Sequence, residues 1–408
     1  MKYIILIGDG MADNPIDSLG GKTPLEFAST PNLDSLAGSG RFGLFASVPK
    51  GYPPGSDVAN LSILGYSPEK YYSGRSPLEA ASIGVKLGPD DVAFRCNLVT
   101  LAEKDGVTIM DDYSSGHIST EEADAIIKSL DAGLRGHGVR FYTGTSYRHL
   151  MVWANGKADL KTRPPHDISD RKIGDDLPKG DGADKLLSLM ADSQRIMKDH
   201  PVNRKRVAAG KKPATSIWLW GQGKAPRMPT LKQRFGVDGA IVSAVDLMKG
   251  IGIYAGLEVL KVPGVTGYID TNYKGKAEYA LAALETKDFV CVHVEAPDEA
   301  GHNGNLKDKL KAIEDFDREI VGRVLEGMEK FAEYRILALT DHPTPIALKT
   351  HTSDPVPFAM CTGGGRSGHG GSAPFCERAA AETGVLVDDC AAFMEEFFDA
   401  QEGVCDID

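Results

Sequence analysis

The sequence lacks long apolar runs. No stretch approaches the ~20 consecutive apolar residues that a membrane-spanning helix needs. The N-terminal run Tyr3–Ile7 is interrupted by Gly8 and Asp9, which makes it too short for a signal peptide. We therefore expect a cytoplasmic protein without a membrane partner.

Paired cysteines and an excess of positive charge are also lacking. The six cysteines lie far apart and form no CxxC pair, so neither a zinc ribbon nor a dithiol redox motif is supported. The 46 Lys and Arg residues against 57 Asp and Glu give a net charge of −11. This balance argues against a nucleic-acid partner, because phosphate backbones attract basic surfaces. Small phosphorylated substrates are still possible, since a few local cations suffice to bind them. The sequence gives no oligomeric state.

Short apolar segments alternate with helical patterns along much of the chain. Segments 2–7, 288–294 and 335–339 are typical of buried parallel strands. Apolar residues at near-helical spacing predict helices over 240–255 and 307–330. The alternation predicts an α/β sandwich with a mostly parallel sheet.

A chain of 408 residues exceeds what one core usually serves, so two domains are expected. The middle of the chain differs in texture, with a hairpin-like segment over 91–108 and a basic loop over 203–212. We predict a smaller α/β domain inserted into a core domain. The expected limits are 91–214 for the insertion, with 1–90 and 215–408 forming the core.

Three of the predicted strands are followed by an acid: Asp9, Asp298 and Asp341. Ligands in open α/β sheets bind outside the carboxyl ends of parallel strands. We therefore expect these carboxylates to converge at one edge of the sheet, although they are far apart in the sequence.

Histidines accompany two of these acids at metal-ligand spacing. His302 follows Asp298 by four residues, and Asp341 precedes His342 and, further on, His351. Mixed Asp and His ligands suit Mn²⁺, Zn²⁺ or Mg²⁺. Taken singly, an acid after a strand is often a helix cap and a DxxxH pair is often structural. Three acids with three histidines together predict a metal site.

A candidate nucleophile, Ser56, follows Gly55 where an apolar helical pattern begins. At a helix N-terminus the backbone N–H groups and the helix dipole stabilise an alkoxide or a phosphoserine. The alternative is that Ser56 is only a helix N-cap, the commonest role for serine before a helix.

Several motifs in this order resemble one family, the cofactor-independent phosphoglycerate mutases, in the short branch found in archaea and many bacteria within the alkaline-phosphatase superfamily. The resemblance spans about residues 2 to 360 and implies an alkaline-phosphatase-like three-layer sandwich whose inserted domain is a lid that binds substrate. The motifs are LIGDGMAD, TPNLDSLA, GSDVANLSILGY, GRSPLEAASIGV, FRCNLVTL, GHIST, SYRH, DTNYKGKA, EAPDEAGH and TDHPTP with THTSDPVPF.

By this resemblance the chain binds two divalent metal ions, with Mn²⁺ favoured and Zn²⁺ or Mg²⁺ as alternatives. It further implies that Ser56 is a nucleophile that carries a phosphoserine intermediate. The implied ligands are Asp298, His302 and His351 for one ion, and Asp9, Asp341, His342 and Ser56 for the other.

Substrate-binding candidates are residues that could grip phosphate or carboxylate groups. Motif context favours His117, Arg148 and Lys276, and each could instead be a surface ion pair. Arg75, Arg95, Asn97 and Arg227 are looser candidates. The glycine-rich segment Gly363–Gly371 matches neither a Walker A loop nor a GxGxxG motif, and a mobile loop is expected there.

The resemblance implies interconversion of 3-phosphoglycerate and 2-phosphoglycerate, independent of 2,3-bisphosphoglycerate, in glycolysis and gluconeogenesis. The alternatives are a homoserine kinase-like phosphotransferase acting on a small alcohol, or a metal-dependent phosphatase, phosphodiesterase or sulfatase. A non-catalytic binding module is a further alternative.

Overall fold

The computed structural model describes residues 1–363 and 372–398, so most of the predicted glycine-rich loop, 364–371, lies outside the described residues. The chain divides into two compact units, one formed by Met1–Tyr72 with Arg227–Asp408 and the other by Ser73–Pro226. The second unit extends past the predicted limits of 91 and 214. Its first helix, α5 (Arg75–Ser82), packs on the sheet of this unit, and Ser73 and Ser76 donate to the carbonyls of Lys224 and Gly221.

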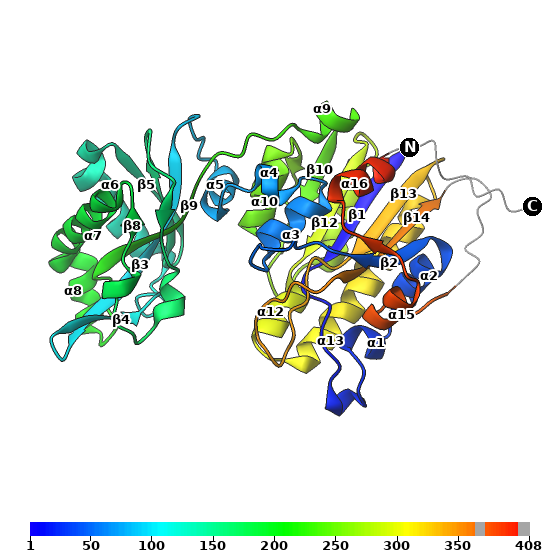
Figure 1. Cartoon of the computed structure of the whole chain (residues 1–408), viewed down its shortest axis with the longest axis horizontal. Coiled ribbons are helices and arrows are strands. Elements are labelled where there is room, and N and C mark those ends of the chain that lie inside the picture. Colours follow the sequence, from blue (N-terminus) through cyan, green and yellow to red (C-terminus); the bar gives the residue numbers. More distant parts are fainter. Residues whose placement is uncertain (364–371, 399–408) are drawn as a thin grey trace, which may run out of the picture. The chain divides into compact units, whose positions relative to one another are not determined.

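The first unit contains an eight-stranded sheet in the order β11-β10-β12-β1-β13-β14-β2-β15 (Figure 1). Of these strands β14 alone is antiparallel to its neighbours. The strands are β1 Lys2–Gly8, β2 Arg41–Phe45, β10 Gly239–Val242, β11 Glu258–Val259, β12 Phe289–Val294, β13 Tyr334–Leu339, β14 Val356–Gly363 and β15 Leu386–Val387.

The central strands are apolar because both faces of the sheet are covered. Every residue of β12 and β13 is buried, and only the first residue of β1 is partly exposed. Continuous Val, Ile and Leu runs are typical of parallel strands between two helical layers. The predicted α/β fold with a mostly parallel sheet is confirmed.

Helices complete the first unit. They are α1 Pro24–Phe27, α2 Pro31–Ser39, α3 Ser56–Ile63, α4 Pro68–Tyr71, α9 Leu231–Phe235, α10 Asp246–Tyr254, α11 Tyr273–Ala283, α12 Ala296–His302, α13 Leu306–Asp315, α14 Arg323–Met328, α15 Glu377–Glu382 and α16 Cys390–Phe398, with a π-helical segment Phe316–Gly322 joining α13 to α14. The predicted helix over 307–330 is therefore present.

The predicted helix over 240–255 is wrong in its first third. Residues Gly239–Val242 form strand β10, which pairs in parallel with β12, and helix α10 begins only at Asp246. A short apolar run fits a buried strand as well as a helix. Here the segment forms a strand because it pairs with both β11 and β12.

The second unit is built on an antiparallel sheet in the order β4-β3-β6-β5, with β9 also paired to β3. Helix α6 begins at a capping box in which Ser119 and Glu122 each bind the other's backbone N–H. The predicted basic loop over 203–212 is largely helical. The elements are β3 Val92–Lys104, β4 Val107–Asp112, β5 Val139–Thr145, β6 Arg148–Trp153, β9 Ser216–Lys224, the short pair β7 Leu160–Lys161 and β8 Lys179–Gly180, and helices α6 Thr120–Leu134, α7 Ala183–Lys198 and α8 Pro201–Ala208.

In the described part of the chain no helix has both the length and the apolar character that crossing a membrane requires.

Candidate active site

The carboxyl ends of β12, β1 and β13 bring the three predicted acids to one edge of the sheet. Asp9 follows β1 directly, and its backbone N–H donates to the carbonyl of Val294 at the end of β12. Asp298 lies in the first turn of α12, and Asp341 follows β13 after one intervening residue. All three acids are buried, so segments that are distant in sequence meet at one place.

One cluster, here called the first cluster, consists of Asp298, His302 and His351. The two imidazoles face each other, with their Nε2 atoms 2.8 Å apart. Asp298 Oδ2 lies 3.4 Å from Nε2 of His302, and Asp298 Oδ1 lies 3.3 Å from Nε2 of His351. The two imidazole nitrogens and the carboxylate of Asp298 thus lie around one position.

The second cluster consists of Asp9, Asp341, His342 and Ser56, and His342 is at its centre. Nε2 of His342 lies 3.6 Å from Asp9 Oδ1, 3.4 Å from Asp341 Oδ2 and 3.1 Å from Ser56 Oγ. His342 also lies close to Asp298 and His351 of the first cluster. The two clusters are therefore adjacent.

Ser56 is the first residue of α3, and Gly55 occupies the N-cap position without a side-chain cap. The hydroxyl of Ser56 faces His342. One turn later, the amide of Asn60 donates to the carbonyl of Ser56 and to Oδ2 of Asp341, both at 2.9 Å. Asn60 therefore joins the start of α3 to the second cluster. Sequence reasoning missed it, although an amide within an apolar helix was a usable signal.

His293 was also missed. It lies in β12 between apolar residues, is fully buried, and has Nε2 3.0 Å from Oδ2 of Asp9. On its other side Nδ1 lies 3.2 Å from the hydroxyl of Ser243. Asp9, His293 and Asp341 alone would form a possible cation-binding group. A histidine in an otherwise apolar buried strand was the available signal.

The pKa values of Asp9 and Asp298 are shifted in opposite directions. Burial raises the pKa of Asp9 well above its usual range, and the carboxylates of Asp341 and Asp298 raise it further. Burial also acts to raise the pKa of Asp298, but hydrogen bonds from His302 and His351 outweigh it and hold this pKa well below its usual range. The bond to Asp298 raises the pKa of His302 to about 9. Such opposed shifts are typical of functional sites.

The donor set fits divalent cations. Within the described residues, Asp9 Oδ1 is buried and has no hydrogen-bond partner, which is costly unless another group satisfies it. Carboxylate oxygens with imidazole nitrogens suit Mn²⁺ or Zn²⁺, and Mg²⁺ less well. The arrangement can therefore hold divalent metal ions beside a serine hydroxyl.

Five of the predicted substrate-binding residues lie in the second unit, and three of them form what we call the cationic face: Arg75, Arg95 and Arg148. Burial lowers the pKa of Arg95, the carboxylate of Glu79 opposes this, and the charges of Arg75 and Arg148 lower it further. The guanidinium of Arg95 pairs with Glu79 at 3.0 Å. The guanidinium of Arg95 is therefore close enough to those of Arg75 and Arg148 to be repelled by both, and a bound anion would relieve this repulsion.

Aromatic rings support this face. Trp220 lies under Arg95, 4.5 Å from its guanidinium carbon, and donates from Nε1 to Asn97 at 3.0 Å. Tyr147 lies beside Arg148 and His117. The ring of His166, which sequence reasoning missed, lies 5.6 Å from that of Trp220.

The other two candidates lie in the first unit. Lys276 is fully buried in α11 and donates to the carbonyl of His293 at 2.9 Å, and burial lowers its pKa to about 8. Arg227 is exposed. Lys276 thus contacts the backbone of β12 at His293, and its amine is less accessible to a substrate than that of a lysine on the surface.

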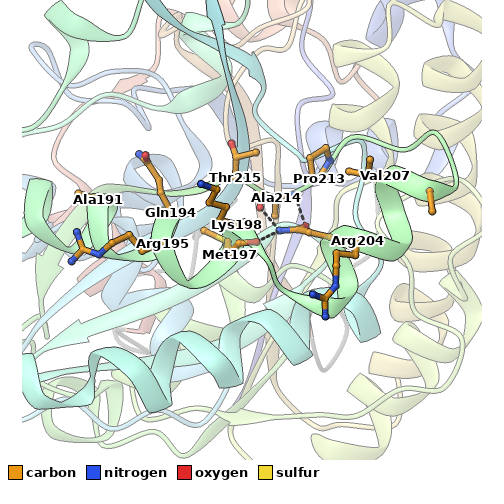
Figure 2. Close-up of a pocket in the computed structure, with 12 residues that line it drawn as sticks. Ala191, Gln194, Arg195, Met197, Lys198, Arg204, Val207, Pro213, Ala214 and Thr215 are labelled. Carbon is orange, nitrogen blue, oxygen red and sulfur yellow. Dashed lines mark hydrogen bonds between the residues drawn. The ribbon is translucent and has the colours of Figure 1, made fainter.

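A large groove in the second unit, drawn in Figure 2, is lined by none of the predicted substrate-binding residues. It lies between α7, α8 and residues 213–215, where Asn203 binds the carbonyls of Met197 and Ala214. Its lining contains arginine and lysine but no carboxylate and no histidine. It therefore offers no metal ligands.

Known proteins resemble this chain closely. A family model described as 2,3-bisphosphoglycerate-independent phosphoglycerate mutase matches residues 37–203. A protein of Geobacter sulfurreducens named as a probable member of that family is 57% identical over 98% of this chain and 100% of its own length. The enzyme of that name from Methanosarcina acetivorans is 57% identical over 88% of this chain and 90% of its own.

Two solved structures are similar to this chain over nearly its whole length. A Pyrococcus horikoshii protein covers 98% of both chains with a TM-score of 0.81 at 31% identity. The cofactor-independent phosphoglycerate mutase of Thermoplasma acidophilum covers 98% of this chain and 100% of its own, with a TM-score of 0.65 at 25% identity. On the strength of the near-complete matches at more than half identity, this chain belongs to the 2,3-bisphosphoglycerate-independent phosphoglycerate mutase family.

Proposed function

We propose that this protein interconverts 3-phosphoglycerate and 2-phosphoglycerate through a phosphoserine at Ser56, in the cytoplasm and without 2,3-bisphosphoglycerate. The observation that carries the proposal is the hydroxyl of Ser56, 3.1 Å from Nε2 of His342 where two acid and imidazole clusters meet. The relatives named for this reaction support it. The role would be in glycolysis and gluconeogenesis.

Two divalent ions are proposed, with Mn²⁺ favoured and Zn²⁺ or Mg²⁺ as alternatives. Such ions supply positive charge that lowers the pKa of a hydroxyl and stabilises phosphoryl oxygens in an in-line displacement. The proposed ligands are the first cluster, Asp298, His302 and His351, and the second cluster, Asp9, Asp341, His342 and Ser56.

The chain's own chemistry is a pair of reversible transfers at Ser56. In the first, Oγ of Ser56 forms a bond to phosphorus while the bond from phosphorus to the glycerate oxygen breaks. The proton that Ser56 loses balances the one that the glycerate hydroxyl gains. In the second, the neighbouring hydroxyl of the retained glycerate forms a bond to phosphorus while the bond from phosphorus to Oγ of Ser56 breaks, and the proton that this hydroxyl loses balances the one that Ser56 regains. The helix N-terminus at Ser56 favours the added negative charge.

Retention of glycerate between the two transfers requires groups that bind anions. We propose that the inserted domain supplies them through Arg75, Arg95, Asn97, His117 and Arg148. Arg227 and Lys276 are proposed to assist from the first unit. Guanidinium groups bind carboxylate and phosphate in bidentate fashion, and the fixed position of Arg95 between Glu79 and Trp220 limits the entropy lost on binding.

The test of the proposed function is an enolase-coupled assay with 3-phosphoglycerate, without added 2,3-bisphosphoglycerate. We expect turnover that a chelator abolishes and added Mn²⁺ restores. Parallel reactions contain ATP with homoserine, or 3-phosphoglycerate with detection of free phosphate. Homoserine-dependent ATP consumption without mutase turnover would favour the kinase, and phosphate release at the rate of substrate loss would favour a phosphatase.

Arg148→Ala is expected to raise KM for 3-phosphoglycerate about 10- to 100-fold, because a charge-assisted hydrogen bond contributes about 1.5–3 kcal/mol. Arg148 is exposed beside Tyr147, so folding should be unaffected. Steady-state kinetics measures the effect. The matched control is Arg195→Ala, which removes another exposed guanidinium of the second unit, one paired with Asp192. Equal KM values for the two variants would exclude Arg148 as a substrate clamp.

A further inference from the structure

We propose that the hydroxyl of Thr344 is a positioning group that joins the two metal clusters, by donating to Asp298 of the first cluster and accepting from His342 of the second. The inference rests on the proposed metal ligands. It adds to them a residue that touches neither substrate nor ion and acts through the ligands themselves.

The contacts of Thr344 define the direction of each bond. Its Oγ1 lies 2.5 Å from Oδ1 of Asp298 and 3.3 Å from Nδ1 of His342, and all three residues are buried. An ionised carboxylate only accepts hydrogen bonds, so the single hydroxyl proton goes to Asp298. The oxygen then presents lone pairs to Nδ1 of His342, which must carry the proton of the neutral ring.

This arrangement fixes the tautomer of His342. With the proton on Nδ1, the lone pair is on Nε2, the atom that faces Ser56, Asp341 and Asp9. Metal-bound histidines commonly donate their second ring nitrogen to a fixed acceptor, which sets the ring orientation and raises ligand basicity. Here one hydroxyl serves the histidine of one cluster and the carboxylate of the other.

Contacts of the backbone and methyl group of Thr344 fix the orientation of its side chain. Its backbone N–H donates to Ala12, and its carbonyl accepts from Nζ of Lys309 at 2.8 Å. Lys309 is itself fixed by Asp13 at 2.8 Å, in a fully buried ion pair. The methyl group of Thr344 faces Gly301, where an added Cβ would come within 2.8 Å of it.

Gly10 shows how closely the parts fit. It has a φ of +63°, and an added Cβ would lie 2.6 Å from the Thr344 hydroxyl and 2.7 Å from Oδ1 of Asp298. Its backbone N–H donates to Oδ1 of Asp341 at 3.0 Å. Glycine is therefore required beside Thr344 for both conformation and space.

Two substitutions separate the hydroxyl from the methyl group. Thr344→Val keeps the shape and removes the hydroxyl, whereas Thr344→Ser keeps the hydroxyl and removes the methyl. We expect Thr344→Val to lower Mn²⁺ affinity and kcat each about 10- to 100-fold, the usual effect of losing a partner of a metal ligand. Thr344→Ser should stay within about threefold of the parent on both measures, because the hydrogen bonds of the ligands are kept.

Mn²⁺ binding is measured by electron paramagnetic resonance on the purified full chain, and melting of the metal-free proteins is followed in parallel. Parent-like Mn²⁺ affinity in Thr344→Val would overturn the inference, as would equal losses of affinity in the two variants. If Thr344→Val does not fold, Thr344→Ser decides alone, since a serine variant with weakened Mn²⁺ binding contradicts a role for the hydroxyl.

The same measurements separate this inference from the proposed function. A parent chain that binds two Mn²⁺ ions but does not turn over 3-phosphoglycerate would refute the mutase, while the valine and serine comparison of affinity still decides the role of Thr344. A parent chain that binds no Mn²⁺ would overturn both.

Discussion

Ser56→Ala is expected to abolish mutase turnover while the metal content stays at the parent value. The loss should be on the order of 10⁴-fold or more, as is usual when the attacking atom of a covalent mechanism is removed. Metal is expected to stay bound because Asp9, Asp341 and His342 still surround the second position. Enolase-coupled kinetics and elemental analysis of the same sample measure the two quantities.

The matched control is Ser62→Ala in the same helix. The hydroxyl of Ser62 is buried and donates to the carbonyl of Val58 within α3. This control removes an equivalent atom without touching either cluster, and its turnover should be near that of the parent. A normal rate in Ser56→Ala would remove Ser56 as the nucleophile. The parent and Ser56→Ala are also incubated with 3-phosphoglycerate labelled in its phosphate group. Label bound covalently to the parent but not to Ser56→Ala would support the phosphoserine.

Asp298→Asn is expected to halve the bound metal, from two equivalents to one, and to lower turnover by about 10³-fold or more, since two-ion sites need both charges for displacement. An amide oxygen is a weaker, uncharged ligand, and His302 and His351 would then face each other without the carboxylate that pairs with both. His302→Ala should have the same effect on metal content.

Glu326→Gln, an exposed carboxylate in α14, is the control for the loss of one negative charge and should bind two equivalents. Metal content after exhaustive dialysis gives the answer. Two tightly held ions in Asp298→Asn would contradict the division of ligands into two clusters, even if turnover fell.

The sequence predicted the site best where an acidic residue follows the end of a predicted strand. Asp9, Asp298 and Asp341 were predicted to converge because parallel strands deliver their carboxyl ends to one edge, and the structure places them together. Helix α6, Thr120–Leu134, carries a different kind of signal, since its capping box is local in the chain. The first signal follows from a general rule of parallel sheets, and the second from geometry that is local in the chain.

The residues that were missed act through tertiary contacts. His293, Asn60 and Thr344 follow no spacing rule, since each takes its place from a partner 46 or more residues away. The strand Gly239–Val242 was taken for part of a helix because four apolar residues carry no usable period. Lys276 is a predicted substrate-binding residue, and its burial against β12, where its amine donates to the carbonyl of His293, could not be read from the sequence. Burial of a lysine amine depends on the packed neighbours, which the sequence does not display.

The reversed direction of β14 has a consequence for how the site could change. Since β13 runs toward the ligand edge and β14 runs away from it, the connection between them starts and finishes at that edge. This single excursion, residues 340–355, carries Asp341, His342 and His351, which belong to both clusters. An insertion or deletion between His342 and His351 would shift a ligand of one ion relative to the ligands of the other, so we expect variation in loop length among working relatives to be concentrated in other connections.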